Sequence, residues 1–406
     1  MNLSQGLAQL VQSGNVFFLI WGAVMVFSMH AGFAFLEAGS VRKKNVVNAF
    51  TKILSDWSVS TVVYFFIGFP LAYGITFLTP ISQLLGDQGF NLAHFFFLLT
   101  FAACIPAIIS GGIAERAQFG TQIIAGAIFV GLIYPLYEAL VWGRFGIIGG
   151  VSGWLANFAG VPFHDFAGSV VVHAMGGWLA LPAILILGPR LGRYLKGKSM
   201  PLPLHSIPYL SLGTWLLMIG WFGFNVASAG VMTRVSGLVA VNSLLAMVGG
   251  ALAALVFSKN DSVFIHNGAL AGLIAVCAGS DIFHPVAALI VGIIAGIIFT
   301  KCFVIETEVF KIDDVLGVWP LHGIAGAWGG IAAGIFGYEF LGGAGGVSIV
   351  SQLIGVGACL VIALIAGTIV YKFLDAISGI RLSKRDEMLG SDLAVHRVKA
   401  YPEELL

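Results

Sequence analysis

The chain has 406 residues, of which 58% are hydrophobic and 10% are charged, whereas soluble domains hold about 45–50% apolar and about 25% charged residues. This composition excludes an ordinary soluble domain and predicts an all-α polytopic membrane protein. The 20 Lys and Arg residues nearly balance the 19 Asp and Glu residues. No net field therefore attracts nucleic acid, and we expect no nucleic-acid partner.

Helices that cross the hydrocarbon core of a membrane need about 20 predominantly apolar residues. Between its polar breaks the chain has eleven such runs, and each predicts one transmembrane helix. They lie near residues 15–40, 46–76, 92–113, 119–142, 168–188, 206–226, 236–257, 264–279, 285–304, 314–337 and 347–373.

The distribution of cations predicts the orientation, because Lys and Arg accumulate in cytoplasmic loops. With the N-terminus outside and the C-terminus inside, only Arg144 and Arg234 fall outside. We therefore expect a multi-pass protein of the cell (inner) membrane, with a transmembrane domain over 1–377 and a solvated cytoplasmic tail over 378–406. The cations that then fall inside are Arg42, Lys43, Lys44, Arg116, Arg190, Arg193, Lys196, Lys198, Lys259, Lys301, Lys311 and those between Lys372 and Lys399.

An internal repeat relates spans 1–5 to spans 6–10. The first and sixth spans share the pattern GFxxxxAG, from Gly32 and from Gly223. In the fifth and tenth spans an aspartate stands eight residues before a histidine and a glycine four residues after it. A repeat of five spans inverts its copy across the membrane, so we expect an inverted repeat followed by an eleventh helix, with the functional path at the interface of the halves.

The two histidines of this repeat, His173 and His322, are the main candidates for a functional site. A single neutral imidazole in a span is often only a hydrogen bond between helices, but two at matching positions favour a shared role. Such a pair can offer hydrogen bonds to a small polar solute and remain neutral. Metal binding is the rival interpretation. It needs a third or fourth ligand, and the sequence offers none close to both, so we expect no metal and no cofactor.

The remaining intramembrane polar residues have plainer interpretations. His30 has a tryptophan as its repeat partner, and we expect it to be a packing residue. Asp165 is suited to capping the start of the fifth span, and Asp313 and Asp314 to complementing the dipole of the tenth. Pro320, beside His322, and Pro106, in the third span, should interrupt their helices.

Aromatic residues near the proposed path suggest its solute. Phe101, Trp142 and Phe224 would be ordinary membrane-facing residues if taken alone, but Ser228 stands one turn beyond Phe224 and few carboxylates are available to pair with a cation. Aromatic faces and a hydroxyl suit a small cation. Ammonium satisfies this description, and desolvation favours its neutral form, which can then pass the two imidazoles. Alkali ions have no uncharged form.

Several motifs across nearly the whole chain resemble the ammonium transporter family, the Amt/Mep/Rh group, and within it the Amt branch. They are HAGFAFLEAGSVRKKNVVN, FAACIPAIISGGIAERAQF, DFAGSVVVHAMGG, GWFGFNVASAG and DDVLGVWPLHGIAGAWGG.

The resemblance assigns roles to individual residues. It implies an outer ammonium site of Phe101, Trp142 and Ser228, a gate of Phe101 and Phe224, a pore with the twin histidines His173 and His322, and a structural and electrostatic role for Asp165. It also implies a homotrimer with one pore per subunit, methylammonium as a second substrate, and a cytoplasmic regulator of the PII type. The chain departs from many relatives at Gly317, where they carry an aspartate.

The resemblance leaves two functions open. The first is a channel that recruits ammonium, deprotonates it and conducts ammonia, with or without a separately transferred proton. The second is an ammonium sensor that signals through the cytoplasmic tail or a fused domain. No nucleophile, base and orienting group converge in the sequence, so we do not expect an enzyme.

Overall fold

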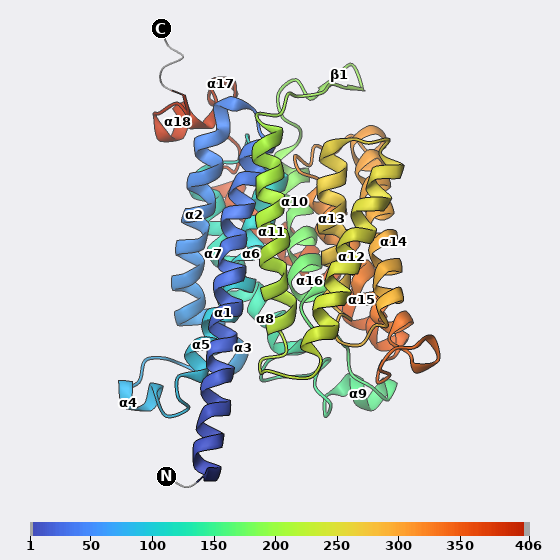
Figure 1. The fold of residues 1–406 in the computed structure, drawn as a ribbon. Coiled ribbons are helices and arrows are strands. Elements are labelled where there is room, and N and C mark those ends of the chain that lie inside the picture. Colours follow the sequence, from blue (N-terminus) through green and yellow to red (C-terminus); the bar gives the residue numbers. More distant parts are fainter. Residues whose placement is uncertain (1–2, 402–406) are drawn as a thin grey trace.

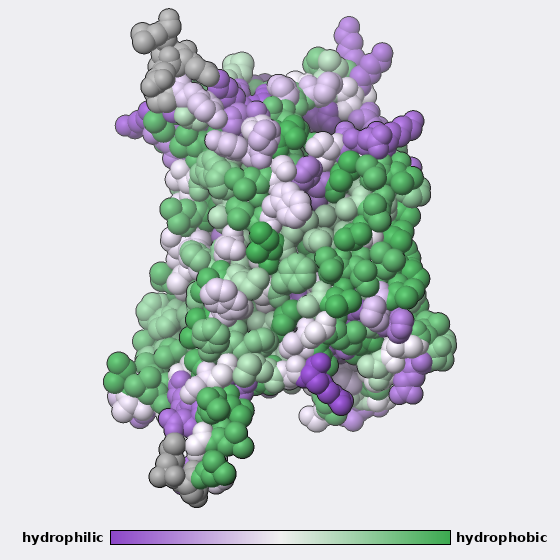
Figure 2. Space-filling view, in the orientation of Figure 1, coloured by the Kyte–Doolittle hydropathy of each residue, from purple (hydrophilic) through white to green (hydrophobic). Residues whose placement is uncertain are grey.

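The computed structural model describes residues 3–401 as a bundle of helices. The helices run roughly parallel to one long axis, and the two ends of the chain lie at opposite ends of the bundle (Figure 1). We call these the N-terminal face and the C-terminal face. On the side drawn in Figure 2, the middle of the bundle is largely hydrophobic and hydrophilic residues gather toward both faces, as a membrane requires.

The first half of the chain contains α-helices that several π-helical turns interrupt. Its elements are α1 (Leu3–Ser40), η1 (Lys43–Asn45), α2 (Val46–Val63), η2 (Tyr64–Gly68), α3 (Phe69–Tyr73), α4 (Ile81–Leu84), α5 (Phe90–Ala102), α6 (Cys104–Ile113), α7 (Phe119–Ile128), η3 (Phe129–Ile133), α8 (Tyr134–Val141), α9 (Trp154–Ala159), η4 (Ser169–Ala174) and α10 (Met175–Leu187).

The second half begins with a two-stranded antiparallel hairpin and continues as helices. Its elements are β1 (Tyr194–Leu195), β2 (Lys198–Ser199), α11 (Ile207–Ala227), α12 (Ser236–Phe257), α13 (Ser262–Val276), α14 (Pro285–Val304), η5 (Ile305–Val309), η6 (Trp319–Ile324), α15 (Ala325–Phe336), η7 (Glu339–Leu341), α16 (Ile349–Ser378), α17 (Lys384–Leu389) and α18 (Ser391–His396).

Between residues 3 and 401, nine helical segments are long and apolar enough to cross a membrane, by length and composition. Two expected spans correspond to shorter segments. The span near 264–279 is α13, with 15 residues, and the span near 314–337 is η6 followed by α15. The expected count of eleven spans stays a prediction. The third span is interrupted at Ala103, between α5 and α6, shortly before Pro106, as a proline inside a helix predicts.

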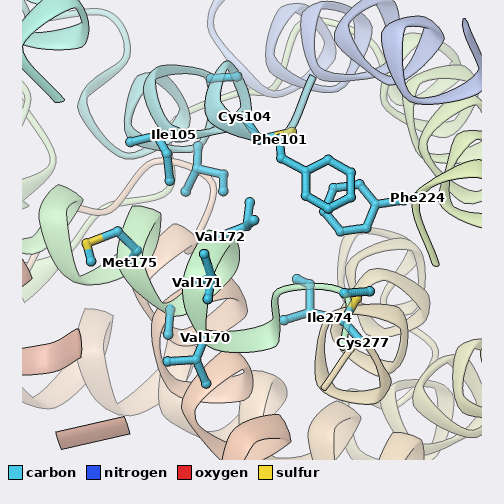
Figure 3. Close-up of a cluster of buried hydrophobic side chains, with 14 of the residues drawn as sticks. Phe101, Cys104, Ile105, Val170, Val171, Val172, Met175, Phe224, Ile274 and Cys277 are labelled. Atoms are coloured by element: carbon cyan, nitrogen blue, oxygen red, sulfur yellow. The ribbon is translucent and has the colours of Figure 1, made fainter. Parts of the chain in front are cut away.

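Glycines allow the helices to pack at backbone distance. Helix α1 packs along α11, and a Cβ added to Gly213 of α11 would lie 2.3 Å from the Leu36 nitrogen and 2.6 Å from the Gly32 oxygen of α1. In lipid the hydrophobic effect does not drive helices together, and close packing at small residues stabilises their association instead. Around this pair the core is apolar and closely packed, and Figure 3 shows the part of it that surrounds Phe101, Phe224 and the η4 residues Val170, Val171 and Val172.

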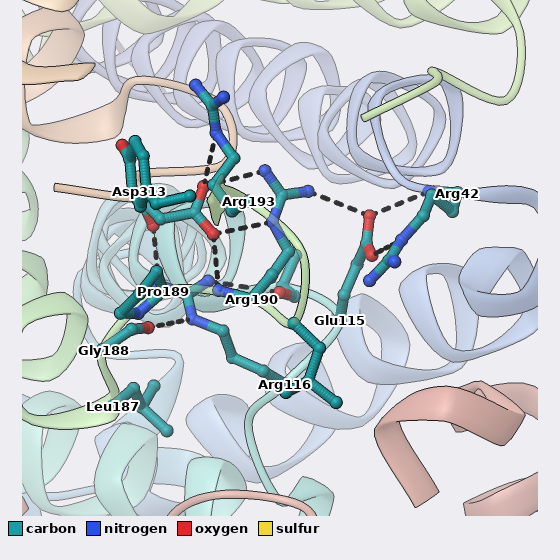
Figure 4. Close-up of polar contacts among 12 residues, drawn as sticks. Arg42, Glu115, Arg116, Leu187, Gly188, Pro189, Arg190, Arg193 and Asp313 are labelled. Atoms are coloured by element: carbon teal, nitrogen blue, oxygen red, sulfur yellow. Dashed lines mark hydrogen bonds and ion pairs between the residues drawn. The ribbon is translucent and has the colours of Figure 1, made fainter. Parts of the chain in front are cut away.

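A buried ion network closes the C-terminal face (Figure 4). Arg190 lies between two carboxylates: its Nε is 2.9 Å from an Asp313 oxygen and its Nη1 is 3.0 Å from a Glu115 oxygen. Glu115 also pairs with Arg42, and Arg193 approaches Asp313 at 3.4 Å. The expected role of Asp313 as a helix-dipole partner is therefore wrong, because its carboxylate is ion-paired instead.

Two opposed effects act on the pKa of Asp313. Burial alone raises the pKa of this carboxyl, but the hydrogen bonds and the charge of Arg190 outweigh burial and lower the pKa to about 2. The network joins the segments after α1, α6, α10 and η5, so it fixes the helix ends against one another.

The expectation of a solvated tail is wrong for part of residues 378–401. Helix α16 continues to Ser378, and Glu387, Ser391 and Asp392 are buried. The Asp392 carboxylate accepts a hydrogen bond from the Asn48 backbone N–H at 2.9 Å. This N–H lies in the first turn of α2, where backbone donors have no partner within the helix. The tail therefore caps α2, which its charge pattern alone did not reveal.

A change of Gly213 to Ala tests the glycine crossing. We expect it to lower the free energy of unfolding by about 1–3 kcal/mol, because the added methyl overlaps the backbone of α1. Thermal unfolding in detergent measures the change. The matched control is Gly237→Ala in α12, where a Cβ meets nothing within 4 Å; it should leave stability equal or slightly higher. Equal losses in both variants would contradict the crossing.

An acid titration of stability tests the Asp313 ion pairs. Because the folded-state pKa is lowered to about 2, the stabilisation is complete above the unfolded pKa of about 4 and is lost as the pH falls toward 2. Asp313→Asn should cost about 3–5 kcal/mol at neutral pH and should remove this part of the acid transition. Glu308→Gln, which breaks the exposed pair of Glu308 with Lys311, should change little. An acid transition unaltered by Asp313→Asn would contradict the assignment.

Candidate functional site

An aromatic cavity of about 240 Å³ opens at the N-terminal face, between α3, α5, the end of α8 and the end of α11. It is lined by Phe101, Trp142 and Ser228, three residues that the sequence selected, and also by Tyr73 and His94, which it did not. The Trp142 indole N–H donates to the Asp165 carbonyl at 2.7 Å, which fixes the ring. The Ser228 hydroxyl donates to the Phe224 carbonyl at 2.8 Å, so its lone pairs remain for an N–H donor.

Two stacked rings close the bottom of this cavity. The centroids of Phe101 and Phe224 are 3.8 Å apart with an interplanar angle of 7°, and Figure 3 shows the rings overlapping face to face. Both residues are buried. A hydrated ion cannot pass this apolar layer without losing its water, and desolvation disfavours a charged species.

The two histidines lie directly beyond the stacked rings. The His173 ring is 5.4 Å from Phe224 and 5.4 Å from His322, measured between centroids. The two Nδ1 atoms are 3.3 Å apart, within hydrogen-bonding distance. His173 Nε2 is buried and has no hydrogen-bond partner. One imidazole therefore donates to the other, and His173 retains a polar atom for a small solute.

The same local structure carries both histidines. Each lies in a π-helical turn, η4 or η6, and each turn follows a glycine with a positive φ, Gly168 at 95° and Gly317 at 70°. An aspartate precedes each glycine by three residues. Asp165 and Asp314 each accept a hydrogen bond from the backbone N–H five residues later, at 2.9 and 2.8 Å. A Cβ at Gly317 would lie 2.9 Å from the Phe303 ring, so a larger residue there would press against Phe303.

Matching glycines bring the two histidine segments together. A Cβ at Gly177 would lie 2.2 Å from the Gly323 nitrogen, and a Cβ at Gly326 would lie 2.4 Å from the Ser169 oxygen. These are the glycines that follow each histidine by four residues. Any larger residue would push the two segments apart and separate the imidazoles.

Asp165 makes the contacts of a helix cap. Its carboxylate accepts backbone N–H donors of Gly168, Val170 and Val171 at 3.0, 2.9 and 2.8 Å. Burial raises the pKa of this carboxyl to about 6, and the three donors oppose the rise. The contacts hold the start of η4, just below the aromatic cavity.

A cavity of about 20 Å³ lies on the other side of the histidines. It is large enough for about one molecule the size of water. His322, Phe33 and Glu37 line it, and Glu37 is held by Lys52, whose Nζ is 2.9 Å from a carboxylate oxygen. Glu37 was not among the residues that the sequence singled out. Its position in a span was a signal that an ionisable residue lines a polar cavity.

Four features follow one another along the bundle axis: the aromatic cavity, the stacked rings, the paired imidazoles and the small inner cavity. With the nine long apolar helical segments between residues 3 and 401, this buried series belongs to an integral membrane protein. Residues 16–401 match the sequence profile described as the Ammonium Transporter Family. The chain belongs to that family and is a multi-pass membrane protein.

Relatives and solved structures agree with this assignment over the whole chain. The protein is 42% identical to "Ammonium transporter Amt2" of Methanocaldococcus jannaschii, over 99% of this chain and 95% of that protein. It is 37% identical to "Ammonium transporter Amt2" of Archaeoglobus fulgidus, over 95% and 88%.

Among solved structures, the chain superimposes on one titled "Sensor Amt Protein" with a TM-score of 0.86 and 30% identity, over 96% of this chain and 99% of that one. It superimposes on Candida albicans Mep2 with a TM-score of 0.78 and 25% identity, over 92% and 87%.

Replacement of Asp165 by Ala tests the helix-capping contacts. It leaves three buried N–H groups without an acceptor, and we expect a loss of more than about 3 kcal/mol of unfolding free energy, since each orphaned donor costs about 1–3 kcal/mol. Asp261→Ala removes the exposed cap of α13 and should cost about 1 kcal/mol. Thermal unfolding compares the two, and equal losses would contradict the buried role of Asp165.

Proposed function

We propose that this protein is an ammonium channel that recruits ammonium at the aromatic cavity and conducts ammonia past the paired imidazoles. The observation that carries the proposal is the direct succession of two stacked phenylalanine rings and two imidazoles whose Nδ1 atoms are 3.3 Å apart. An apolar layer followed directly by neutral hydrogen-bonding groups suits a solute that can lose a proton and cross the layer as a neutral molecule.

Recruitment uses the faces of aromatic rings and one hydroxyl. Trp142 and Phe101 meet at a centroid distance of 6.2 Å on the wall of the cavity, and each desolvated cation–π contact is worth about 2 kcal/mol. The Ser228 oxygen accepts an N–H of the ammonium ion. Asp165 does not line this cavity, and its proposed role is to hold the start of η4 and to support the approach of the cation electrostatically.

Passage requires that ammonium lose one proton before the stacked rings. Ammonium then becomes ammonia and a proton, and only ammonia enters the apolar layer. On the far side the buried, unpartnered Nε2 of His173 offers a hydrogen bond, and the inner cavity beside His322 has room for one small molecule. Potassium and sodium have no neutral form and stay outside. A current during an ammonium pulse shows whether the proton also crosses.

The proposal includes an architecture. Eleven spans form an inverted repeat of spans 1–5 and 6–10 with an added helix, and the matching Asp–Gly–His segments support it. The N-terminus lies outside and the C-terminus inside the cell (inner) membrane, with a transmembrane domain at 1–377 and a tail at 378–406. The family resemblance supports a homotrimer, methylammonium as a second substrate, and a PII-type cytoplasmic regulator.

A sensing role is the second candidate, favoured by the structural similarity to the protein titled "Sensor Amt Protein". A sensor would bind ammonium without moving it. Growth of cells that lack other ammonium carriers, on low ammonium, separates the two functions.

Uptake of labelled methylammonium tests the channel. We expect His173→Ala and His322→Ala to reduce the maximal rate by about tenfold or more, because the apolar layer then opens onto no hydrogen-bonding group. Trp142→Leu should raise the half-saturating concentration about tenfold, by loss of a cation–π contact.

The control for these variants is His266→Ala. His266 is partly exposed, and its ring lies near Ser262 and Ser211, away from the path. It should transport at the rate of the unmodified protein. Normal uptake by both pore-histidine variants would overturn the proposed path, and binding of ammonium without uptake by the unmodified protein would favour sensing.

A further inference from the structure

A carboxylate lies buried behind the wall of the aromatic cavity. Glu138 of α8 has no exposed surface. A charged side chain within a membrane span is costly, and such residues mark functional sites by default. Neither the sequence analysis nor the proposed channel gives Glu138 a role.

Three tyrosine hydroxyls hold this carboxylate. Tyr64 donates to it at 2.9 Å, Tyr73 at 3.0 Å and Tyr134 at 3.4 Å. An ionised carboxylate only accepts hydrogen bonds, whereas a protonated one also needs an acceptor. Three phenolic hydroxyls can all donate to one carboxylate and so favour its ionised form.

No cation neutralises Glu138 among residues 3–401. The ion pairs of this region involve other carboxylates: Glu37, Glu115, Asp281, Asp313, Glu308 and Glu387. The negative charge of Glu138 is therefore stabilised by dipoles alone, and its field is not cancelled locally.

One of the three phenols connects Glu138 to the cavity. Tyr73 lines the cavity beside His94, Phe101 and Trp142, while its hydroxyl donates to Glu138. The carboxylate thus lies one side chain behind the surface that a cation touches. In a medium of low dielectric constant, a single charge acts over such a distance with little screening.

We propose that Glu138, held by Tyr64, Tyr73 and Tyr134, is an electrostatic determinant of cation affinity at the aromatic cavity. This inference rests on the proposed channel. The carboxylate attracts ammonium into a cavity whose own walls carry no carboxylate. It stays behind Tyr73, so it does not bind the ion directly and does not retain it. Glu138 therefore acts through its negative charge and not by contact, and the Tyr73 side chain is the surface that the cation contacts.

The test compares the concentration dependence of methylammonium uptake in Glu138→Gln and in the unmodified protein. Glutamine keeps the shape and still accepts the phenolic hydrogen bonds but removes the charge. We expect the half-saturating concentration to rise about tenfold or more, as for one charge within about 12 Å at an effective dielectric constant of about 20. The maximal rate should not change, because the stacked rings and imidazoles are untouched. A merely structural role would lower the maximal rate with the amount of folded protein.

Two further variants serve as controls. Glu138→Asp keeps the charge and should restore the normal half-saturating concentration. Tyr137→Phe, on the same helix, removes a buried hydroxyl that donates to the Gly355 carbonyl at 2.8 Å instead of to Glu138. It should leave uptake unchanged. An unchanged half-saturating concentration in Glu138→Gln, with normal uptake by the unmodified protein, overturns this inference alone; absence of uptake in the unmodified protein overturns the channel itself.

A variant that removes the charge and its donors together covers the case in which Glu138→Gln does not fold. Glu138→Met combined with Phe at Tyr64, Tyr73 and Tyr134 leaves no orphaned polar group, and such apolar replacements of buried charges are often stable. The half-saturating concentration should rise by the same factor as in Glu138→Gln. Infrared spectra of the unmodified protein give an independent answer: a protonated-acid band that shifts in Glu138→Asp would overturn the inference, and an ionised-carboxylate band that shifts would support it.

Discussion

The crossing of two helical segments at matching glycines is the constraint on which the rest of the structure depends. Gly177 lies against the Gly323 backbone and Gly326 against the Ser169 backbone, and only this approach brings the His173 and His322 imidazoles within 3.3 Å. Each of the two imidazoles is carried by a π-helical turn. The stacked phenylalanines and the two cavities are arranged around this point.

Membrane burial explains why several polar groups of this protein form closed sets. A charge or hydrogen-bonding group without a partner is costly in hydrocarbon. Arg190 therefore lies between Asp313 and Glu115, and Asp165 receives three backbone donors. Glu138 accepts hydrogen bonds from phenols and has no ion-pair partner among residues 3–401, which is the basis of its proposed action on the aromatic cavity.

Periodicity and repetition made the path predictable in outline. The matching Asp and His positions in two spans indicated paired imidazoles, and Phe224 with Ser228 pointed to the region where the structure has an aromatic cavity. Trp142 and Phe101 could be selected only by their resemblance to a family, because a lone aromatic residue in a membrane span carries little information. Tyr73 and His94 escaped prediction because nothing in their local sequence says which way a side chain points, whereas the ionisable side chain of Glu37 within a span was a signal that could have been used.

The sequence by itself determined the membrane class, the approximate spans and the two histidines, because hydropathy and internal repetition are properties of the chain read in order. The tertiary structure alone decided which buried polar groups contact one another. Glu138 meets Tyr64 across 74 positions of the chain, and Asp392 meets the start of α2 across 344. Such contacts follow from the relative rotation and depth of packed helices, which glycine crossings and helix interruptions set and which no local pattern records.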